Sequence, residues 1–599
     1  MKYRRKWLLF STAAMVLTAT IGGMASPVKA KNSDKPLDLP TQYSAPGKST
    51  KAGNNSTLKL AIMNDAPFKG IASADLSDND EDTQAFKPGN SNLLFKTDDN
   101  HKIVDGGLAN QSLDKDAKTA TITIRDNAKW SNGAPVTAKD VEYPYEVIAN
   151  KNSTSQQYSS DFEAIEGMKE YHEGSAKTIS GITFPDGENG KKVVIHFTKM
   201  APAMAYTGNT FIWGSADPYE YIKKVPIAKL ASASQIRKKP LFTGPYKLDH
   251  LVSGESTSWS PNKYYYGKKP NIKHISIQVV SSHNSAAAIK SKKYDFYLGG
   301  QGVPTSEFPS VKHLKDYTWV GQPAQSYNYF GFNVGHFDTK KQVSVMDKHS
   351  KMGNKKLRQA MMYALDIDSV DKKFGNGLKW RGTTLIPPFY KQYHDDKLVG
   401  YKYNMKKANK LLDQAGYKKK GKWRTQPNGK PLTIYYGAMQ GSSANESAYR
   451  YNIQQWQKAG LNVKMTNGKT MEMNSFYSTL QKPKQNKIDI YSGAWKLGDE
   501  PSQTSVYGAN APFNYGHFVT AKNTELLNKM NDEQSWNESY RKQQFYDWQK
   551  YMNDQAAYVP ESYAMDYAPV NHRVKGYNIN AGKSEDFWSD LSLTAANPK

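Results

Sequence analysis

KWSNGAPVTAKDVEYPYEVI, residues 129–148, joins a tryptophan, a tight turn and a helix start within one short stretch, and it decides much of the fold. Just before it, apolar and polar side chains alternate over residues 120–124, which is the period of a half-buried strand. Asn132-Gly133 then predicts a tight turn, because these residues tolerate positive φ angles. We therefore expect a strand followed by a turn at this place.

A helix is predicted directly after the turn. Thr137 and Asp140 have the spacing of a capping box, and apolar residues follow at helical spacing. Pro144 has no N–H to donate to the carbonyl of Asp140, so we expect it to kink or end this helix.

The composition describes a large, basic and cysteine-free chain. It has 599 residues, 38% of them hydrophobic and 12% aromatic, so two or three domains with real cores are expected. The formal net charge is +26, but the lysines are spread along the chain and form no basic run interleaved with stacking aromatics. This pattern argues against a nucleic-acid partner and favours an anionic cell envelope.

The first residues predict export. Four basic residues precede an apolar stretch, and Val28-Lys29-Ala30 is a small-residue cleavage pattern, so residues 1–30 are predicted to be a signal peptide; an uncleaved anchor is the alternative. Its five basic residues, with no acidic residue among them, leave +21 for the mature chain. Without cysteine there is no disulfide and no thiol to carry a lipid. Residues 31–56 are rich in Pro, Gly and Ser and predict a flexible linker.

The second half of the chain has the alternation of an α/β domain. Strands are predicted at 432–436, 461–465 and 488–491, with helices at 444–459 and 471–480 between them. This order implies parallel pairing with right-handed crossovers.

Catalytic and metal-binding motifs are not found. The twelve histidines show no metal-ligand spacing, and no nucleophile or phosphate-loop motif occurs, although a pair of glycosidase carboxylates is not excluded. The loop expected after strand 488–491 contains Trp495, Asp499, Glu500 and Tyr507. Ligands of open α/β sheets settle at such loops, so an amine-bearing ligand is one interpretation. The alternative is that these aromatics only seal the lobe.

Five segments, taken together and in order, resemble one known family. They are residues 129–143, FTGPYKL at 242–248, SPNKYYYGKKPNIKHISIQVV at 260–280, FGFNVG at 330–335 and LRQAMMYALDID at 357–368. They are similar to segments of the oligopeptide-binding proteins, the extracellular solute-binding family 5 of ABC importers. The resemblance covers about residues 57–592.

The resemblance implies an α/β, two-lobed, periplasmic-binding-protein-like fold of type II, with an extra subdomain inserted in the first lobe. We expect lobe I at 57–99, 243–328 and 556–599, the inserted subdomain at 100–242 and lobe II at 329–555. It implies no covalent chemistry, no cofactor and no metal. The family's lipid-bearing cysteine is missing, so we expect the exported protein to be held at the cell surface by charge.

The resemblance also implies a site and partners. The peptide's α-amine is expected at Asp499, beside aromatic walls from Trp495 and Tyr507, with Glu500 as the competing acid. The partners would be oligopeptides, an ABC permease with its ATPase subunits, and anionic wall polymers; we expect a monomer. The alternatives are a surface adhesin, a hydrolase, or a binder of a metal chelate, haem or sugar on the same fold.

Overall fold

The computed structural model describes residues 36–64, 67–300, 302–347, 349–580 and 586–599. The predicted signal peptide at 1–30, and residues 31–35 of the predicted linker, lie outside the described residues. Within the described ranges, none of the helices combines the length and the apolar character needed to cross a bilayer.

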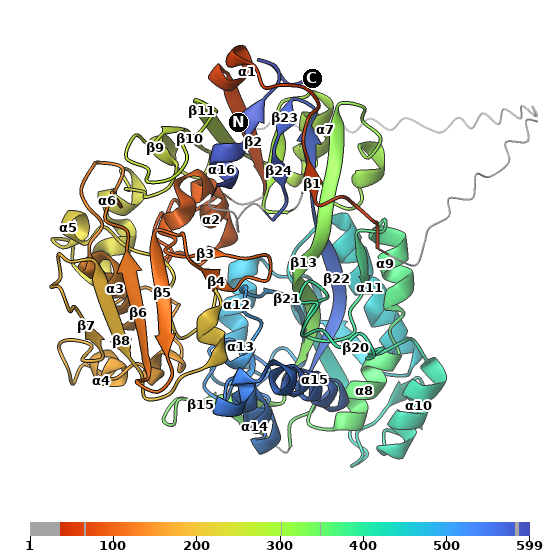
Figure 1. The fold of residues 1–599 in the computed structure, drawn as a ribbon. Coiled ribbons are helices and arrows are strands. Elements are labelled where there is room, and N and C mark those ends of the chain that lie inside the picture. Colours follow the sequence, from red (N-terminus) through yellow and green to blue (C-terminus); the bar gives the residue numbers. More distant parts are fainter. Residues whose placement is uncertain (1–35, 65–66, 301, 348, 581–585) are drawn as a thin grey trace, which may run out of the picture.

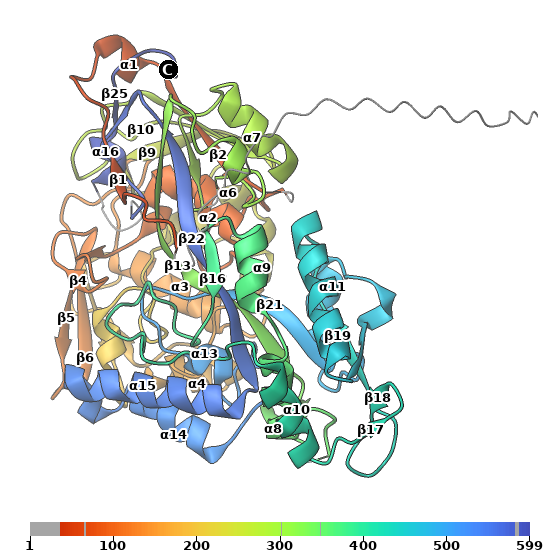
Figure 2. The same cartoon turned by 90° about the vertical axis from the view of Figure 1, so that its right-hand side faces the viewer.

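One sheet of eleven strands runs through the whole molecule (Figures 1 and 2). Its order is β20-β19-β21-β13-β22-β12-β2-β11-β10-β9, with β16 paired to β22. Two long antiparallel strands, β13 (Tyr317–Phe332) and β22 (Tyr558–Asn571), form its middle and extend from one end of the molecule to the other. The two halves of the protein are therefore connected through a shared pair of strands.

Lobe I is built at one end of these two strands. β2 (Thr57–Met63) pairs in parallel with β11 (His274–Val280) and β12 (Phe296–Leu298). The remaining elements of this lobe are β9 (Tyr246–Val252), β10 (Ser256–Pro261), α2 (Asp80–Phe86), α7 (Ser282–Lys290) and α16 (Phe587–Asp590). A buried cluster that includes Leu60 and Trp259 forms its core.

Lobe II is built at the other end and has the predicted alternation. β19 (Thr433–Gly437) pairs in parallel with β20 (Asn462–Met465) and β21 (Ile490–Lys496), which confirms the predicted pairing. Its longer helices are α8 (Lys355–Tyr363), α9 (Ile367–Phe374), α10 (Met405–Gln414), α11 (Ser443–Lys458), α12 (Met473–Leu480), α14 (Ala521–Lys529) and α15 (Glu538–Gln555), with the short α13 (Thr504–Tyr507) before α14.

The strand predicted at 488–491 is wrong at both ends. β21 starts at Ile490 and continues to Lys496, so Trp495 lies in a strand and not in a loop. Residues 490–496 pair with 326–332 of β13, and Gly493 lets the strand pass against the ring of Tyr329. The glycine and polar residues hid this strand from the apolar pattern on which the prediction rested.

The stretch at 129–148 contains a turn and α3, which lie beside a separate small sheet. β5 (Ala109–Asp114), β6 (Thr119–Ile124), β8 (Lys192–His196) and β7 (Ile182–Thr183) pair in that order beside α3 (Ala138–Ala149). The predicted capping box is confirmed. Of the predicted turn residues, Gly133 alone has a positive φ among the described backbone angles.

Pro144, which was expected to kink or end the helix, does not end it. α3 continues past it to Ala149. The carbonyl oxygen of Asp140, which Pro144 leaves free, accepts a hydrogen bond of 2.9 Å from the backbone N–H of Asp217. An outside donor thus replaces the lost helical hydrogen bond, so the helix does not need to stop.

The predicted flexible linker is wrong for residues 36–56. β1 (Gln42–Tyr43) pairs with β24 (Tyr577–Asn578), and α1 (Lys51–Asn55) follows it. The backbone N–H of Gly321, in β13, donates to the carbonyl of Pro40 at 2.9 Å. The sequence pattern missed this because the segment adds its hydrogen bonds to strands formed elsewhere in the chain.

We propose the same division of the chain as the sequence predicts: lobe I at 57–99, 243–328 and 556–599, the inserted subdomain at 100–242, and lobe II at 329–555. Three separate buried clusters support the division, but the cluster of lobe II also contains residues 556–559, so the start of β22 packs with lobe II.

Candidate ligand-binding cleft

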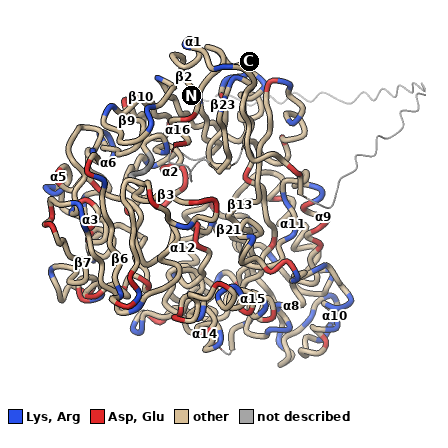
Figure 3. Tube along the Cα trace, in the orientation of Figure 1, with Lys and Arg blue, Asp and Glu red and all other residues tan. Residues whose placement is uncertain are grey.

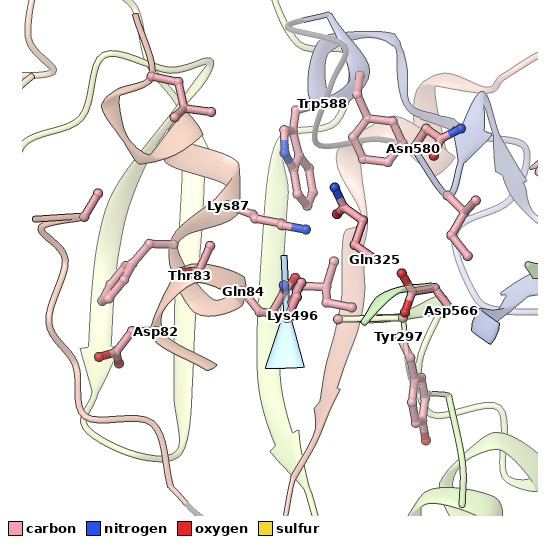
Figure 4. A pocket seen from close by; sticks show the side chains of 18 of the residues that line it. Asp82, Thr83, Gln84, Lys87, Tyr297, Gln325, Lys496, Asp566, Asn580 and Trp588 are labelled. Atoms are coloured by element: carbon pink, nitrogen blue, oxygen red, sulfur yellow. The ribbon is translucent and has the colours of Figure 1, made fainter. Parts of the chain in front are cut away.

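A cleft of about 350 Å³ lies beside the two central strands (Figure 4). Lobe I supplies most of its wall, from α2, the end of β12 and the C-terminal segment, while lobe II supplies Lys496 and Asp499. Phe86, Leu298 and Trp588 give it apolar surface. A largely apolar cleft with a few polar and charged groups is typical of a ligand site.

An ion pair joins the two lobes at this cleft. The ammonium of Lys496, the last residue of β21, lies 2.8 Å from a carboxylate oxygen of Asp80, the first residue of α2. Burial acts to raise the pKa of Asp80, but the charge and hydrogen bond of Lys496, with smaller contributions from Lys87 and Gln84, together hold that pKa below its usual value. The pair is therefore charged, and it links lobe I to lobe II across the cleft.

Asp499 borders the cleft directly after β21. One carboxylate oxygen accepts a hydrogen bond from Thr207 Oγ1 at 2.8 Å, and the other accepts one from Gln325 Nε2 at 2.9 Å. His101 Nδ1 lies 2.9 Å from the second oxygen, and 28% of the Asp499 side chain is exposed. Burial raises the pKa of Asp499, although the hydrogen bonds from Thr207 and Gln325 act against this.

A glycine allows the inserted subdomain to reach Asp499. Gly208 has a φ of +71°, and a Cβ atom on it would lie 2.7 Å from the backbone nitrogen of Asp499. A larger residue would push the two loops apart, and Thr207 would then lose the carboxylate. Asp499 is thus the point at which lobe II, the inserted subdomain and β13 meet.

Two of the predicted site residues are not at the cleft, which corrects the sequence-based expectation. Glu500 is buried and forms an ion pair with Arg541 of α15, and the side chains of both are less than 5% exposed. Tyr507 is 1% exposed, and its hydroxyl lies 2.7 Å from that of Tyr327 inside the core of lobe II. The partners come from distant segments, so no local pattern separated Glu500 from its neighbour Asp499.

Trp495 lies near the cleft but does not line it. Its ring is half-buried and packs on Phe513, with ring centroids 4.6 Å apart. Along a strand, side chains point alternately to opposite faces, and Lys496 is the neighbour that reaches the cleft.

The sequence reasoning missed four charged residues around the cleft: Asp80, Lys87, Lys496 and Asp566. Figure 4 shows Lys87 reaching into the space from the side of α2, with Asp566 on the opposite side. Lys496 is the neighbour of Trp495 in the loop that the sequence predicted, so this predicted position was a signal that could have been used. Asp566 lies within β22, in a strand with no local motif. Among the described residues, no group of three or more His, Asp or Glu side chains is arranged to hold a metal ion.

Two lobes joined by a shared strand pair, with a cleft between them, define a solute-binding protein. The family described as "Bacterial extracellular solute-binding proteins, family 5 Middle" matches residues 104–517, and the chain belongs to this family. The predicted α/β, two-lobed fold is confirmed by its structural relatives.

Particular relatives have been characterised as binding proteins. The oligopeptide-binding protein OppA of Lactococcus lactis subsp. cremoris (strain SK11) is 41% identical over 551 residues, which is 91% of this chain and 91% of that protein. A structure of lactococcal OppA complexed with an endogenous peptide in the closed conformation has a TM-score of 0.85 at 40% identity, covering 90% of this chain and all of that one. The structure of the oligopeptide-binding protein AppA from Bacillus subtilis in complex with a nonapeptide is 19% identical, with a TM-score of 0.70. The match covers 91% of this chain and 100% of that one, and it shows the shared fold.

Proposed function

We propose that this protein captures oligopeptides in the cleft and delivers them to an ABC permease and its ATPase subunits. The observation that carries the proposal is the match to the peptide-complexed lactococcal structure over 90% of this chain. No covalent chemistry is involved in this function, and a monomer is sufficient for it.

An open strand edge supports the recognition of a peptide backbone. β19 pairs only with the first two residues of β21, Ile490 and Tyr491. From Ser492 to Lys496 β21 pairs with β13 on one side, and its other edge pairs with no strand of the described residues. An extended peptide can add to such an edge through main-chain hydrogen bonds, which do not depend on its sequence.

The α-amine of the peptide is proposed to bind at Asp499. Thr207 and Gln325 already donate to the carboxylate, but an ionised carboxylate offers about four acceptor positions. An ammonium can therefore join these donors, and it would add the charge that they lack.

The test is calorimetric titration of the protein, freed of co-purifying ligand, with defined peptides of four to ten residues. We expect saturable binding that survives moderate salt, and intact peptides in mass spectra afterwards. An adhesin would show no saturable binding to free peptides, while a hydrolase would produce fragments; either result would refute the proposal.

The proposed location is outside the cell, at an anionic surface. Figure 3 shows Lys and Arg distributed over all parts of the fold, and the mature charge would be +21. Such contacts are screened within about 3 Å at 1 M salt, against about 8 Å at physiological ionic strength. A wash of intact cells in molar salt should therefore release the protein, whereas release only by detergent or protease would point to another anchor.

A further inference from the structure

Asp566 differs from the other acids of the cleft in having no partner. Both oxygens of Asp499 accept hydrogen bonds, and Asp80 pairs with Lys496. The carboxylate of Asp566 borders the cleft, yet it forms no hydrogen bond or ion pair with any described residue. A half-buried carboxylate without partners is costly for a protein, unless something else supplies the missing contacts.

The backbone leaves room for this carboxylate. Gly300 has a φ of +71°, and a Cβ atom there would lie 2.7 Å from the carboxyl carbon of Asp566. The carbonyl of Gly300 also accepts a hydrogen bond of 2.8 Å from the N–H of Tyr567, so the turn at Gly300 is fixed against β22. The close approach of Asp566 to Gly300 is thus a built feature of the fold.

The charged groups facing Asp566 do not satisfy it. The charged groups are Lys496 from β21, Asp80 from α2 and Lys87 from the turn after α2. The neutral hydroxyl of Tyr577, from β24, is a further titratable group nearby. Lys496 is committed to Asp80, and neither lysine comes within ion-pair distance of Asp566. Burial raises the pKa of Asp566 to about 6, although the charges of Lys496 and Lys87 act against this.

We propose that Asp566 is a second recognition carboxylate of the cleft, which accepts the ammonium or guanidinium group of a lysine or arginine side chain of the bound peptide. This inference rests on the proposed peptide binding and adds a preference for basic peptides to it. A cationic side chain supplies both the hydrogen bonds and the charge that Asp566 lacks.

The test compares peptides that differ by a single charge. Lysine is placed at each position of an otherwise uncharged hexapeptide in turn, and glutamine at the same position gives the neutral counterpart. We expect one or two positions where wild type binds the lysine peptide about ten- to a hundredfold more tightly, as a charge-assisted hydrogen bond provides. The variant Asp566→Asn should lose this ratio and bind the glutamine peptides as wild type does.

Glu81→Gln is the matched control. It removes one negative charge from α2 near the cleft without altering the residues that line it, so the ratio should persist. A wild type without any lysine preference, or an Asp566→Asn variant that keeps it, would overturn the inference while leaving peptide binding intact. Equal weakening of lysine and glutamine peptides in Asp566→Asn would also overturn it. Absence of all peptide binding by wild type would instead refute the proposed function.

Proton release gives a readout that a purely structural role would not change. A cation bound at Asp566 lowers its pKa, so near pH 6 the lysine peptide should displace about half a proton more than its glutamine counterpart. Calorimetry in buffers of different ionisation enthalpy measures this difference. It should vanish in Asp566→Asn, and equal proton counts for both peptides with wild type would contradict the assignment.

Discussion

Asp140 of the inserted subdomain and Asp566 of the cleft are carboxylates that are held in opposite ways. In the subdomain, Asp140 accepts hydrogen bonds from Trp130 Nε1, Thr137 N–H and Tyr219 N–H, at 2.8–2.9 Å. In the cleft, Asp499 has two neutral donors and Asp566 has none. The partners of these three carboxylates therefore differ: Asp140 is bound by donors of its own subdomain, Asp499 by neutral donors at the rim of the cleft, and Asp566 by no described donor.

Glu500 and Asp499 show the same contrast between neighbours in the chain. Glu500 turns into lobe II and binds Arg541, while Asp499 turns to the cleft. If burial against a charged partner marks Glu500 as a structural acid, its substitution should lower stability, whereas substitution of Asp499 should weaken binding.

The largest expected effect is on stability, in Glu500→Gln. The guanidinium of Arg541 would stay buried without its counter-charge, which costs about 3–5 kcal/mol of the free energy of unfolding. Urea unfolding of wild type and variant measures this. Affinity of the folded variant for peptide should be unchanged, and an unfolding free energy equal to that of wild type would show that Glu500 is not a structural acid.

The next effect is on binding, in Asp499→Asn. Removing the charge opposite a partly desolvated ammonium should weaken a free-amine peptide by about 2–5 kcal/mol, which is roughly thirtyfold to several-thousandfold in Kd. The N-acetylated peptide serves as the control, because it should bind both proteins alike. Unchanged affinity of Asp499→Asn for the free-amine peptide would remove Asp499 from the site.

Asp140→Asn should cost stability and change its pH dependence. Asparagine offers one acceptor oxygen to three donors, so about 1–3 kcal/mol should be lost. Burial raises the pKa of Asp140 to about 6, so between pH 4 and 6 the folded protein binds its proton more tightly than the unfolded chain does. This group therefore lowers the free energy of unfolding as pH rises through that window. Denaturant titrations should find this slope in wild type and a shallower one in Asp140→Asn; parallel curves would contradict it.

Local patterns predicted what local interactions determine. The capping box of Thr137 and the turn at Gly133 follow from neighbours within a few residues. The extension of β21, the packing of residues 36–56 and the pairing of Glu500 depend on segments far away in the chain. For the candidate site, Asp499 could be predicted because it follows a strand in a loop that resembles the family's, whereas Asp566 lies inside a strand and has no sequence signal.

The smallest expected effect concerns Pro144. The backbone carbonyl of Asp140, which the proline leaves without its helical donor, accepts a hydrogen bond from Asp217 instead. A proline inside a helix ordinarily costs about 3 kcal/mol, part of it from the unpaired carbonyl one turn earlier. Here the N–H of Asp217 occupies that carbonyl, so Pro144→Ala should shift the free energy of unfolding by less than about 1 kcal/mol. An alanine N–H would also compete with Asp217 for the one carbonyl, which limits any gain further. Urea unfolding measures the difference, and a stabilisation near 3 kcal/mol would show that the donor from Asp217 does not offset the proline.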